Sequence, residues 1–425
     1  MAKSVRAQNL PGPESIHREV LPNGITVLCR ANFNSPSVVI SGYFMSGSLF
    51  EPDEKLGLAD FMCTSLMRGS EMRSMQELYD ALESAGAAFG YDSGTRSSTF
   101  SGRALVEDLP LLLGILSETI RYPAFPKDQV ERLRTQLLTS LELRAQDTSD
   151  MADLIFDEIL FKGHPFGRPD DGWPETIQAV TRRDLKEFHR RTVGPDGLVI
   201  TVVGAVEPRR AAALVQRALG DWKNPAQKPL PSVPAVLKLK KTHVRHHTIA
   251  GKSQTDIVIG TTGPRRRDDD YLAASLANSV LGQFGMGGRI GDAVREKAGL
   301  AYFAYSHLGA GYEVGTWDVS AGVNPKNIRK ATDLILRELS AFVKRGATKP
   351  ELKDSQDNFI GRLPLSLESN GGVAGALLNM ERYGLGLDYL QRYTGLVRRV
   401  TRDEVRAAAE KYIDPSRLVI ASAGP

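Results

Sequence analysis

The chain has 425 residues, of which 41% are apolar and 24% are charged, and its net charge is +4. This composition is typical of globular proteins, and the length predicts two domains or more. No segment approaches the roughly 20 apolar residues that a membrane-spanning helix needs. The small net charge gives no reason to expect a nucleic-acid partner.

Two further features bear on the compartment. The N-terminal residues include basic side chains but no apolar core, so they do not form an intact signal peptide. Cys29 and Cys63 are too few cysteines for a disulfide framework. We therefore expect a cytoplasmic protein. The alternative is a periplasmic protein whose signal peptide has been removed.

In the N-terminal half, strand-like segments precede helical ones. Residues 24–28 and 37–41 are rich in β-branched side chains, and Asn23-Gly24 predicts a hairpin turn that needs positive φ. Helical periodicity then predicts helices at 56–67, 75–84, 106–119 and 127–146. Strands followed by helices indicate an α+β fold class.

A proline-rich segment separates the two halves. Residues 224–234 contain four prolines, which exclude a helix and favour an extended connector. The basic run at 238–252 follows; because it lacks interleaved aromatics and alternates in character, we interpret it as a solvated strand. The C-terminal half then predicts strands at 255–260 and 317–323, and helices at 271–281, 327–344 and 350–358.

The chain also repeats itself. Val180-Thr181-Arg182 and the following turn and strand return as Val400-Thr401-Arg402 with their own turn and strand, at a constant offset of 220 residues. Each copy reads as an amphipathic helix, a proline-containing turn and a β-branched strand. This self-similarity predicts an internal duplication. We expect homologous domains at 15–222 and 238–425, joined by a linker at 223–237, each an antiparallel-rich sheet packed by helices.

The first candidate site is the octapeptide Gly-Leu-Ala-Asp-Phe-Met-Cys-Thr at 57–64. Asp60, Cys63 and Thr64 share one face of the predicted helix, because positions i, i+3 and i+4 are neighbours there. A zinc peptidase of the H-x-x-E-H type uses that face for two histidine ligands and a glutamate base. Thr64 is a poor zinc ligand, and Cys63 cannot act as a carboxylate base.

The sequence therefore predicts a degenerate zinc motif. Glu142, on the long helix at 127–146, is a candidate third carboxylate, but it binds nothing tightly without the other two ligands. We expect no metal in this chain and interpret Cys63 as a small apolar residue of the core.

The second candidate site lies in the C-terminal half. Glycines at 285, 287 and 288 predict a tight turn before a short helix, and no Gly-Lys-Ser/Thr follows that would indicate phosphate binding. Arg295 at the end of that helix and Tyr302 at the start of a strand could point into one space. Guanidinium and phenol donors suit a peptide carbonyl or its oxyanion. The alternative is a surface arginine and a half-buried strand tyrosine.

Several segments together resemble the pitrilysin and mitochondrial-processing-peptidase family, in its bacterial two-domain branch. The resemblance runs from Leu21-Pro22-Asn23-Gly24 to the final strand. Its most specific segments are Gly57-Leu58-Ala59 after Glu51-Pro52, Gly163-His164-Pro165-Phe166-Gly167, Arg295-Glu296-Lys297 before Gly299-Leu300-Ala301-Tyr302, and Tyr383-Gly384-Leu385.

The resemblance implies a specific division of chemistry. Arg295 and Tyr302 match the family's arginine–tyrosine pair, which clamps the substrate backbone, whereas Asp60, Cys63 and Thr64 do not match the zinc ligands and base. In two-chain members, one subunit carries zinc and its partner carries the pair. Two duplicated chains form a clamshell chamber around an extended peptide, so one chain is half of it.

We therefore expect a non-catalytic subunit of a heterodimeric zinc metallopeptidase, with no activity alone. Its homologous partner would hold the zinc, and an extended or unfolded peptide would be the substrate. Three alternatives remain: a zinc peptidase with a degenerate site, a purely structural subunit like the core proteins of respiratory complexes, and a peptide-binding module or chaperone without a role in catalysis.

Overall fold

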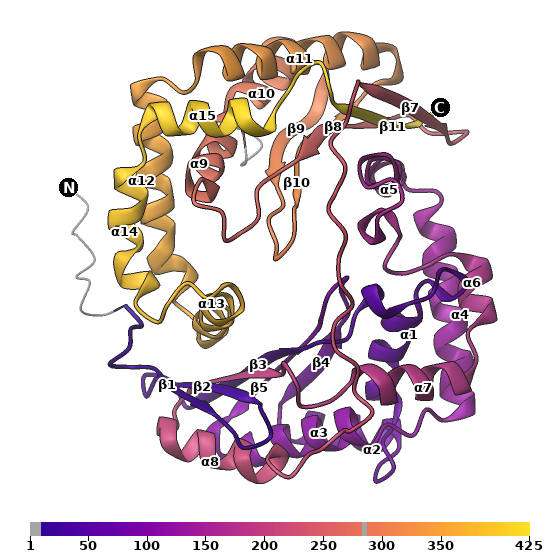
Figure 1. The fold of residues 1–425 in the computed structure, drawn as a ribbon. Coiled ribbons are helices and arrows are strands. Elements are labelled where there is room, and N and C mark those ends of the chain that lie inside the picture. Colours follow the sequence, from indigo (N-terminus) through magenta and orange to yellow (C-terminus); the bar gives the residue numbers. More distant parts are fainter. Residues whose placement is uncertain (1–9, 283–286) are drawn as a thin grey trace. The chain divides into compact units, whose positions relative to one another are not determined.

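The computed structural model describes residues 10–282 and 287–425 (Figure 1). The chain forms two compact units, each assembled from separate stretches of sequence. The first unit combines residues up to Leu141 with Pro169–Val233 and Pro364–Gln391. The second combines Glu142–Arg168, Pro234–Leu363 and Arg392–Pro425.

The first unit contains a six-stranded sheet with the order β1-β2-β6-β3-β5-β4. β2 and β6 are parallel and the other neighbours are antiparallel. The turn predicted at Asn23-Gly24 connects β1 to β2, and Gly24 has a φ of +91°. The strands are β1 (His17–Val20), β2 (Thr26–Ala31), β3 (Ser37–Phe44), β4 (Ala88–Asp92), β5 (Ser98–Leu105) and β6 (Val199–Gly204).

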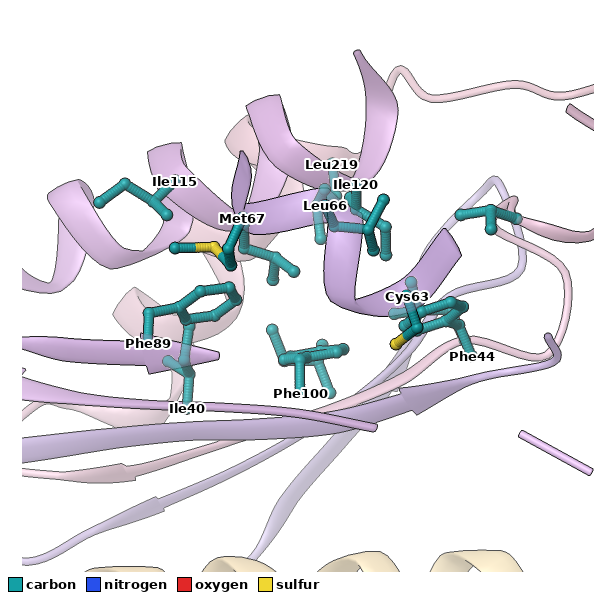
Figure 2. Close-up of a cluster of buried hydrophobic side chains, with 14 of the residues drawn as sticks. Ile40, Phe44, Cys63, Leu66, Met67, Phe89, Phe100, Ile115, Ile120 and Leu219 are labelled. Atoms are coloured by element: carbon teal, nitrogen blue, oxygen red, sulfur yellow. The ribbon is translucent and has the colours of Figure 1, made fainter. Parts of the chain in front are cut away.

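One apolar core joins this sheet to its helices. Figure 2 shows part of it, with Ile40 and Phe100 from the sheet facing Ile115 and Ile120 from α3. Helix α3 buries the face on which leucine and isoleucine recur with helical spacing, as the periodicity predicts. The helices of this unit are α1 (Leu58–Ser65), α2 (Met75–Ser84), α3 (Leu109–Arg121), most of α4 (Lys127–Arg144), α6 (Pro174–Ala179), α7 (Arg182–Thr192), α8 (Pro208–Leu219) and α13 (Asn370–Tyr383).

The second unit contains a five-stranded sheet with the order β7-β11-β8-β10-β9. β7 and β11 are parallel, and the other neighbours are antiparallel. The basic run forms the edge strand β7, whose side chains alternate between half-buried and exposed, which confirms the solvated strand. The strands are β7 (His243–Thr248), β8 (Thr255–Thr262), β9 (Ala301–Leu308), β10 (Thr316–Val323) and β11 (Val419–Gly424).

Helices also pack against this second sheet. Leu276 and Val280 of α9 and Ile335 of α11 lie in its apolar core with Val319 of β10. The helices are α5 (Thr148–Leu160), α9 (Tyr271–Leu281), α10 (Arg289–Gly291), the π-helix η7 (Asp292–Lys297), α11 (Ile328–Arg345), most of α12 (Lys349–Ser366), most of α14 (Tyr389–Arg399) and α15 (Arg402–Tyr412). None of the helices in residues 10–282 and 287–425 is long and apolar enough to cross a membrane.

The two units share one topology, which confirms the α+β class and the internal duplication. β2-β6-β3-β5-β4 match β7-β11-β8-β10-β9 in order and direction. Helices α7 and α15 begin at Arg182 and Arg402, and both are capped by a threonine with an acidic residue three positions later. β6 and β11 begin at Val199 and Val419, so helix and strand both keep the 220-residue offset.

The structure adds a feature that the repeat did not predict. Helix α5, from the first half of the sequence, packs against β8 and β11 of the second sheet. Helix α13, from the second half, packs against β3 and β6 of the first. Asn370 begins α13 and hydrogen-bonds to the Asn32 side chain at 2.7 Å and to the Ser37 hydroxyl at 3.1 Å. Each sheet is therefore completed by a helix from the other half of the sequence.

Candidate functional site

Helix α1, which carries the first candidate site, has a strongly specified start. Gly57 has a φ of +85°, and a side chain there would meet Ile177 and the Asp171 backbone. The buried Glu51 carboxylate accepts hydrogen bonds from the Gly57 N–H at 3.1 Å and the Ala59 N–H at 2.5 Å. A carboxylate at a helix N-terminus is favoured by the unpaired N–H groups and the helix dipole. These contacts fix which side chains of α1 face the core.

Cys63 belongs to the apolar core. It is 1% exposed and lies beside Phe44 (Figure 2). Burial is the main reason that the pKa of the Cys63 thiol rises to about 12. The residue is therefore a neutral thiol at physiological pH, whereas a zinc ligand must be a thiolate.

Asp60 lies in an acidic environment. Burial, together with Asp171, Asp92 and Asp170, raises the pKa of Asp60 to about 6. Asp170 itself is held by hydrogen bonds from the Ser48 and Thr95 hydroxyls. The face of α1 that carries the degenerate motif therefore presents one carboxylate, which carboxylates from other segments repel.

The residues at the degenerate motif do not suit zinc. Asp60 and Thr64 are half-buried on the same turn of α1 as the buried neutral Cys63, so the structure brings the predicted residues together without making a ligand set. Across residues 10–282 and 287–425, no cluster of three or more His, Cys, Asp and Glu side chains is arranged to hold a metal. Glu142 is exposed near the end of α4.

Arg295 of the second candidate site lies on a widened helical turn. Residues Arg289–Gly291 form α10, and the chain continues directly into the π-helix η7. Ile290 and Val294 are fully buried in the core of the second unit and hold this segment against it. The Arg295 side chain is 34% exposed, and its Nε lies 3.7 Å from Glu296 Oε1. π-Turns are rare and occur frequently at functional sites.

Tyr302 lies at an irregularity of the sheet. Ala301 pairs with Val323 and Phe303 with Gly322, so Tyr302 is the extra residue of a β-bulge on the edge strand β9. The Tyr302 side chain is 82% exposed. Bulges redirect side chains and are over-represented beside active sites. The half-buried alternative for Tyr302 is therefore wrong.

A short connection ties the two residues together. The Gly299 N–H donates to the Arg295 carbonyl at 3.0 Å, and the Leu300 N–H donates to the Val294 carbonyl at 3.0 Å. Gly299 has a φ of +61°, which ends the helical segment, and η7 contacts β9. Of the glycines preceding this helix, Gly285 lies in residues 283–286, outside the described residues.

The chemistry available at this site is hydrogen-bond donation. The guanidinium of Arg295 carries five N–H donors and no acceptor, and the phenol of Tyr302 supplies one O–H donor. Such donors bind a peptide carbonyl, and they bind it more strongly when negative charge develops on the oxygen.

Sequence reasoning missed two partners of the motifs it singled out. His164 Nε2 donates to the Pro234 carbonyl at 3.0 Å, and its Nδ1 accepts from the Phe166 N–H at 3.1 Å. Arg289, two residues after Gly287, forms a bidentate ion pair with Glu351. The pair joins residues more than 60 positions apart, so no local sequence pattern predicts it.

The sequence matches two family models, one in each half. Residues 26–169 match the model described as Insulinase (Peptidase family M16), and residues 179–359 match the one described as Peptidase M16 inactive domain. An uncharacterized zinc protease of Streptomyces coelicolor is 25% identical over 96% of this chain and 90% of its own length. The mitochondrial-processing peptidase subunit beta of Saccharomyces cerevisiae is 23% identical over 87% of this chain and 82% of its own.

Solved structures share the fold over almost the whole chain. A crystal structure from Pseudomonas fluorescens, described as a peptidase M16 inactive domain, superposes with a TM-score of 0.89 at 27% identity, covering 96% of this chain and 98% of that one. A protease from Helicobacter pylori superposes with a TM-score of 0.91 at 20% identity, covering 98% and 100%.

Proposed function

The chain belongs to the M16 peptidase family, the pitrilysin and processing-peptidase family that its motifs resemble, and we propose that it is a non-catalytic subunit of a two-chain zinc metallopeptidase. In this proposal a homologous partner holds the zinc. This chain binds the extended peptide and contributes Arg295 and Tyr302 to the partner's active site.

The observation that carries the proposal is the backbone beneath these two side chains. Arg295 lies on a π-turn and Tyr302 on a β-bulge, two irregularities seven residues apart. A solvent-facing tyrosine at 82% exposure contributes little to the core of this unit, so packing does not account for it. Irregular backbone at consecutive elements that carry donor side chains is frequent at functional sites, and it supports a binding role for this pair.

The first site supports the same division of chemistry. The face of α1 that would bind zinc carries a buried neutral thiol, a threonine and an aspartate with a raised pKa. None of these supplies the pair of imidazole ligands and the carboxylate base of an M16 enzyme. We therefore assign no hydrolytic step to this chain alone.

The two donors would act on the peptide that the complex cleaves. Zinc in the partner would activate water for attack on the peptide carbonyl. The Arg295 guanidinium and the Tyr302 hydroxyl would hold the substrate's carbonyl oxygens in place and donate more strongly as negative charge develops. Contacts that strengthen in the transition state raise the rate rather than only the affinity.

The experiment is a comparison of complexes that contain variants of this chain. The tagged chain is purified from its own cells with the partner it retains, and zinc content and cleavage of an unstructured peptide library are measured. Arg295→Ala and Tyr302→Phe should lower kcat/KM by about 10²–10³-fold and leave zinc content unchanged. Tyr305→Phe, on the same strand, is the matched control and should cleave normally.

A second candidate function is peptide binding without catalysis. Among the described residues β9 is an edge strand with β10 as its strand neighbour, and apart from the Ser306 N–H, which donates to the Gly282 carbonyl, its other edge could pair with an added strand. Tight peptide binding by the isolated chain, combined with no zinc-dependent cleavage by any complex that contains it, would favour this candidate.

A further inference from the structure

Arg289 and Glu351 form a tightly matched ion pair in the second unit. Arg289 Nε lies 2.8 Å from Glu351 Oε1, and Arg289 Nη2 lies 2.8 Å from Glu351 Oε2. Nη2 also donates to the Gly346 carbonyl at 3.0 Å, and the guanidinium lies over the Phe342 ring at 5.1 Å. A planar fork of this kind fixes the direction of a side chain as well as its position.

The Arg289–Glu351 pair is partly buried, and each of the two side chains has a further hydrogen-bond partner. The side chains of Arg289 and Glu351 are 17% and 31% exposed. Glu351 also accepts from the Thr348 N–H at 2.6 Å, at the start of α12. The Arg289 guanidinium and the Thr348 contacts outweigh burial and lower the pKa of Glu351 to about 2, so the pair stays ionised at physiological pH.

The helical segment that carries Arg295 begins at Arg289. Gly288 has a φ of +104° and starts α10, which continues into the π-helix η7 without a break. Beyond Arg295, Lys297 forms an exposed ion pair with Asp292. Gly299, with its positive φ, then ends the segment. Among the contacts of the described residues, the Arg289–Glu351 ion pair is therefore a partly buried polar anchor at the N-terminal end of the segment.

We propose that Arg289 and Glu351 are positioning residues for Arg295. The ion pair ties the first turn of the segment to the corner between α11 and α12, and the buried Ile290 and Val294 fix its rotation. Arg295 lies on a π-turn, which lacks the hydrogen-bonding pattern of a regular α-helix. In this proposal the Arg289–Glu351 ion pair therefore fixes the direction in which the Arg295 guanidinium points. The inference rests on the proposed role of Arg295.

The first test uses the chain alone. Hydrogen exchange followed by mass spectrometry is measured for Arg289→Met and for Glu351→Gln. The second variant preserves the size of the side chain and keeps the test informative if Arg289→Met folds poorly. Amides from 292 to 302 should exchange faster in both variants. Arg265→Met removes the local Arg265–Asp268 ion pair elsewhere in the unit, which is more exposed, and should leave these amides unchanged. Unchanged exchange at 292–302 in both pair variants would overturn the proposal.

The second test asks whether the pair acts through Arg295. In the zinc-containing complex, Arg289→Met should lower kcat about 10-fold or more with little change in KM, and Arg289→Lys should recover part of the loss. In the Arg295→Ala background, Arg289→Met should cost no further activity. A full additional loss there would make the pair merely structural and overturn the positioning role. If Arg295→Ala alone leaves cleavage unchanged, the proposed function fails and this inference falls with it.

Discussion

At the residue scale, Asp60 is a carboxylate whose charge is opposed by its surroundings. Its carboxyl lies among Asp171, Asp92 and Asp170 and is partly buried, and its pKa rises from 3.8 to about 6. A zinc ion would neutralise such a group, whereas here its charge is opposed by its surroundings. The residue therefore costs stability at neutral pH.

This cost predicts a pH-dependent effect of Asp60→Asn. Between the ordinary pKa and about 6, the folded chain keeps a proton on Asp60 that the unfolded chain has lost, so stability falls as the pH rises through this window. Asp60→Asn should raise the free energy of unfolding by up to about 2 kcal/mol at about pH 7.5 and change it little near about pH 4.

Urea unfolding at the two pH values checks this. Asp403→Asn, at an exposed position of α15, is the matched control and should show no comparable difference. An Asp60→Asn effect of equal size at both pH values would show that its carboxyl does not titrate in this window.

At the element scale, the duplication provides a paired experiment. Thr181 and Thr401 each accept a hydrogen bond from the N–H three residues later, and the carboxylates of Asp184 and Glu404 accept from the N–H of the cap threonine in return. Thr181→Ala and Thr401→Ala should each destabilise their helix by about 1 kcal/mol, as the loss of a cap typically does.

Hydrogen exchange of the amides of α7 and α15 measures these losses separately in the two units. Thr135→Ala, in the middle of α4, is the control, because its hydroxyl bonds only to the Glu131 carbonyl of its own helix. A loss at one cap and none at the other would mean that the two copies have diverged in how they hold this helix.

Some elements follow from local sequence and others do not. The predictions at 75–84 and 271–281 coincide with α2 and α9, because periodicity and end signals agree there. The prediction at 350–358 ended too early: a glycine at 361 and a proline at 364 indicate a break, yet α12 continues to Ser366 with Pro364 inside it, although a proline has no N–H to donate to the i−4 carbonyl. Helix α13 went unpredicted because glycines at 371, 372 and 375 lower its propensity, and packing against β3 and β6 stabilises it instead.

The candidate site divides in the same way. Arg295 and Tyr302 could be selected from the sequence because they lie in a motif of recognisable spacing. The bulge at Tyr302 depends on the register opposite Gly322 and Val323, and the anchor of Arg289 depends on Glu351. These are long-range contacts, and no local pattern in one sequence predicts them.

At the scale of the whole molecule, the exchanged helices predict that the halves do not fold separately. A fragment ending at Val233 lacks α13, and one starting at Pro234 lacks α5, so each would expose an apolar face of its sheet. Each fragment alone should aggregate or unfold without cooperativity, and the two co-expressed should associate into a folded complex.

Sedimentation and thermal unfolding of the two fragments, alone and together, check this. The intact chain nicked at the same place by a protease is the matched control, since it keeps every contact. Near-native cooperative unfolding of either fragment alone would mean that its sheet folds without the helix, α5 or α13, that packs against it in the intact chain.

In the proposed complex, Arg295 and Tyr302 of this chain supply hydrogen-bond donors to an active site whose zinc is bound by the partner subunit. This claim is tested most directly by kcat/KM and zinc content of the purified complex with Arg295→Ala or Tyr302→Phe in this chain. The account predicts a loss of cleavage of about 10²–10³-fold with the zinc content unchanged. Cleavage at the wild-type rate by both variants, in a complex with full zinc content, would contradict it.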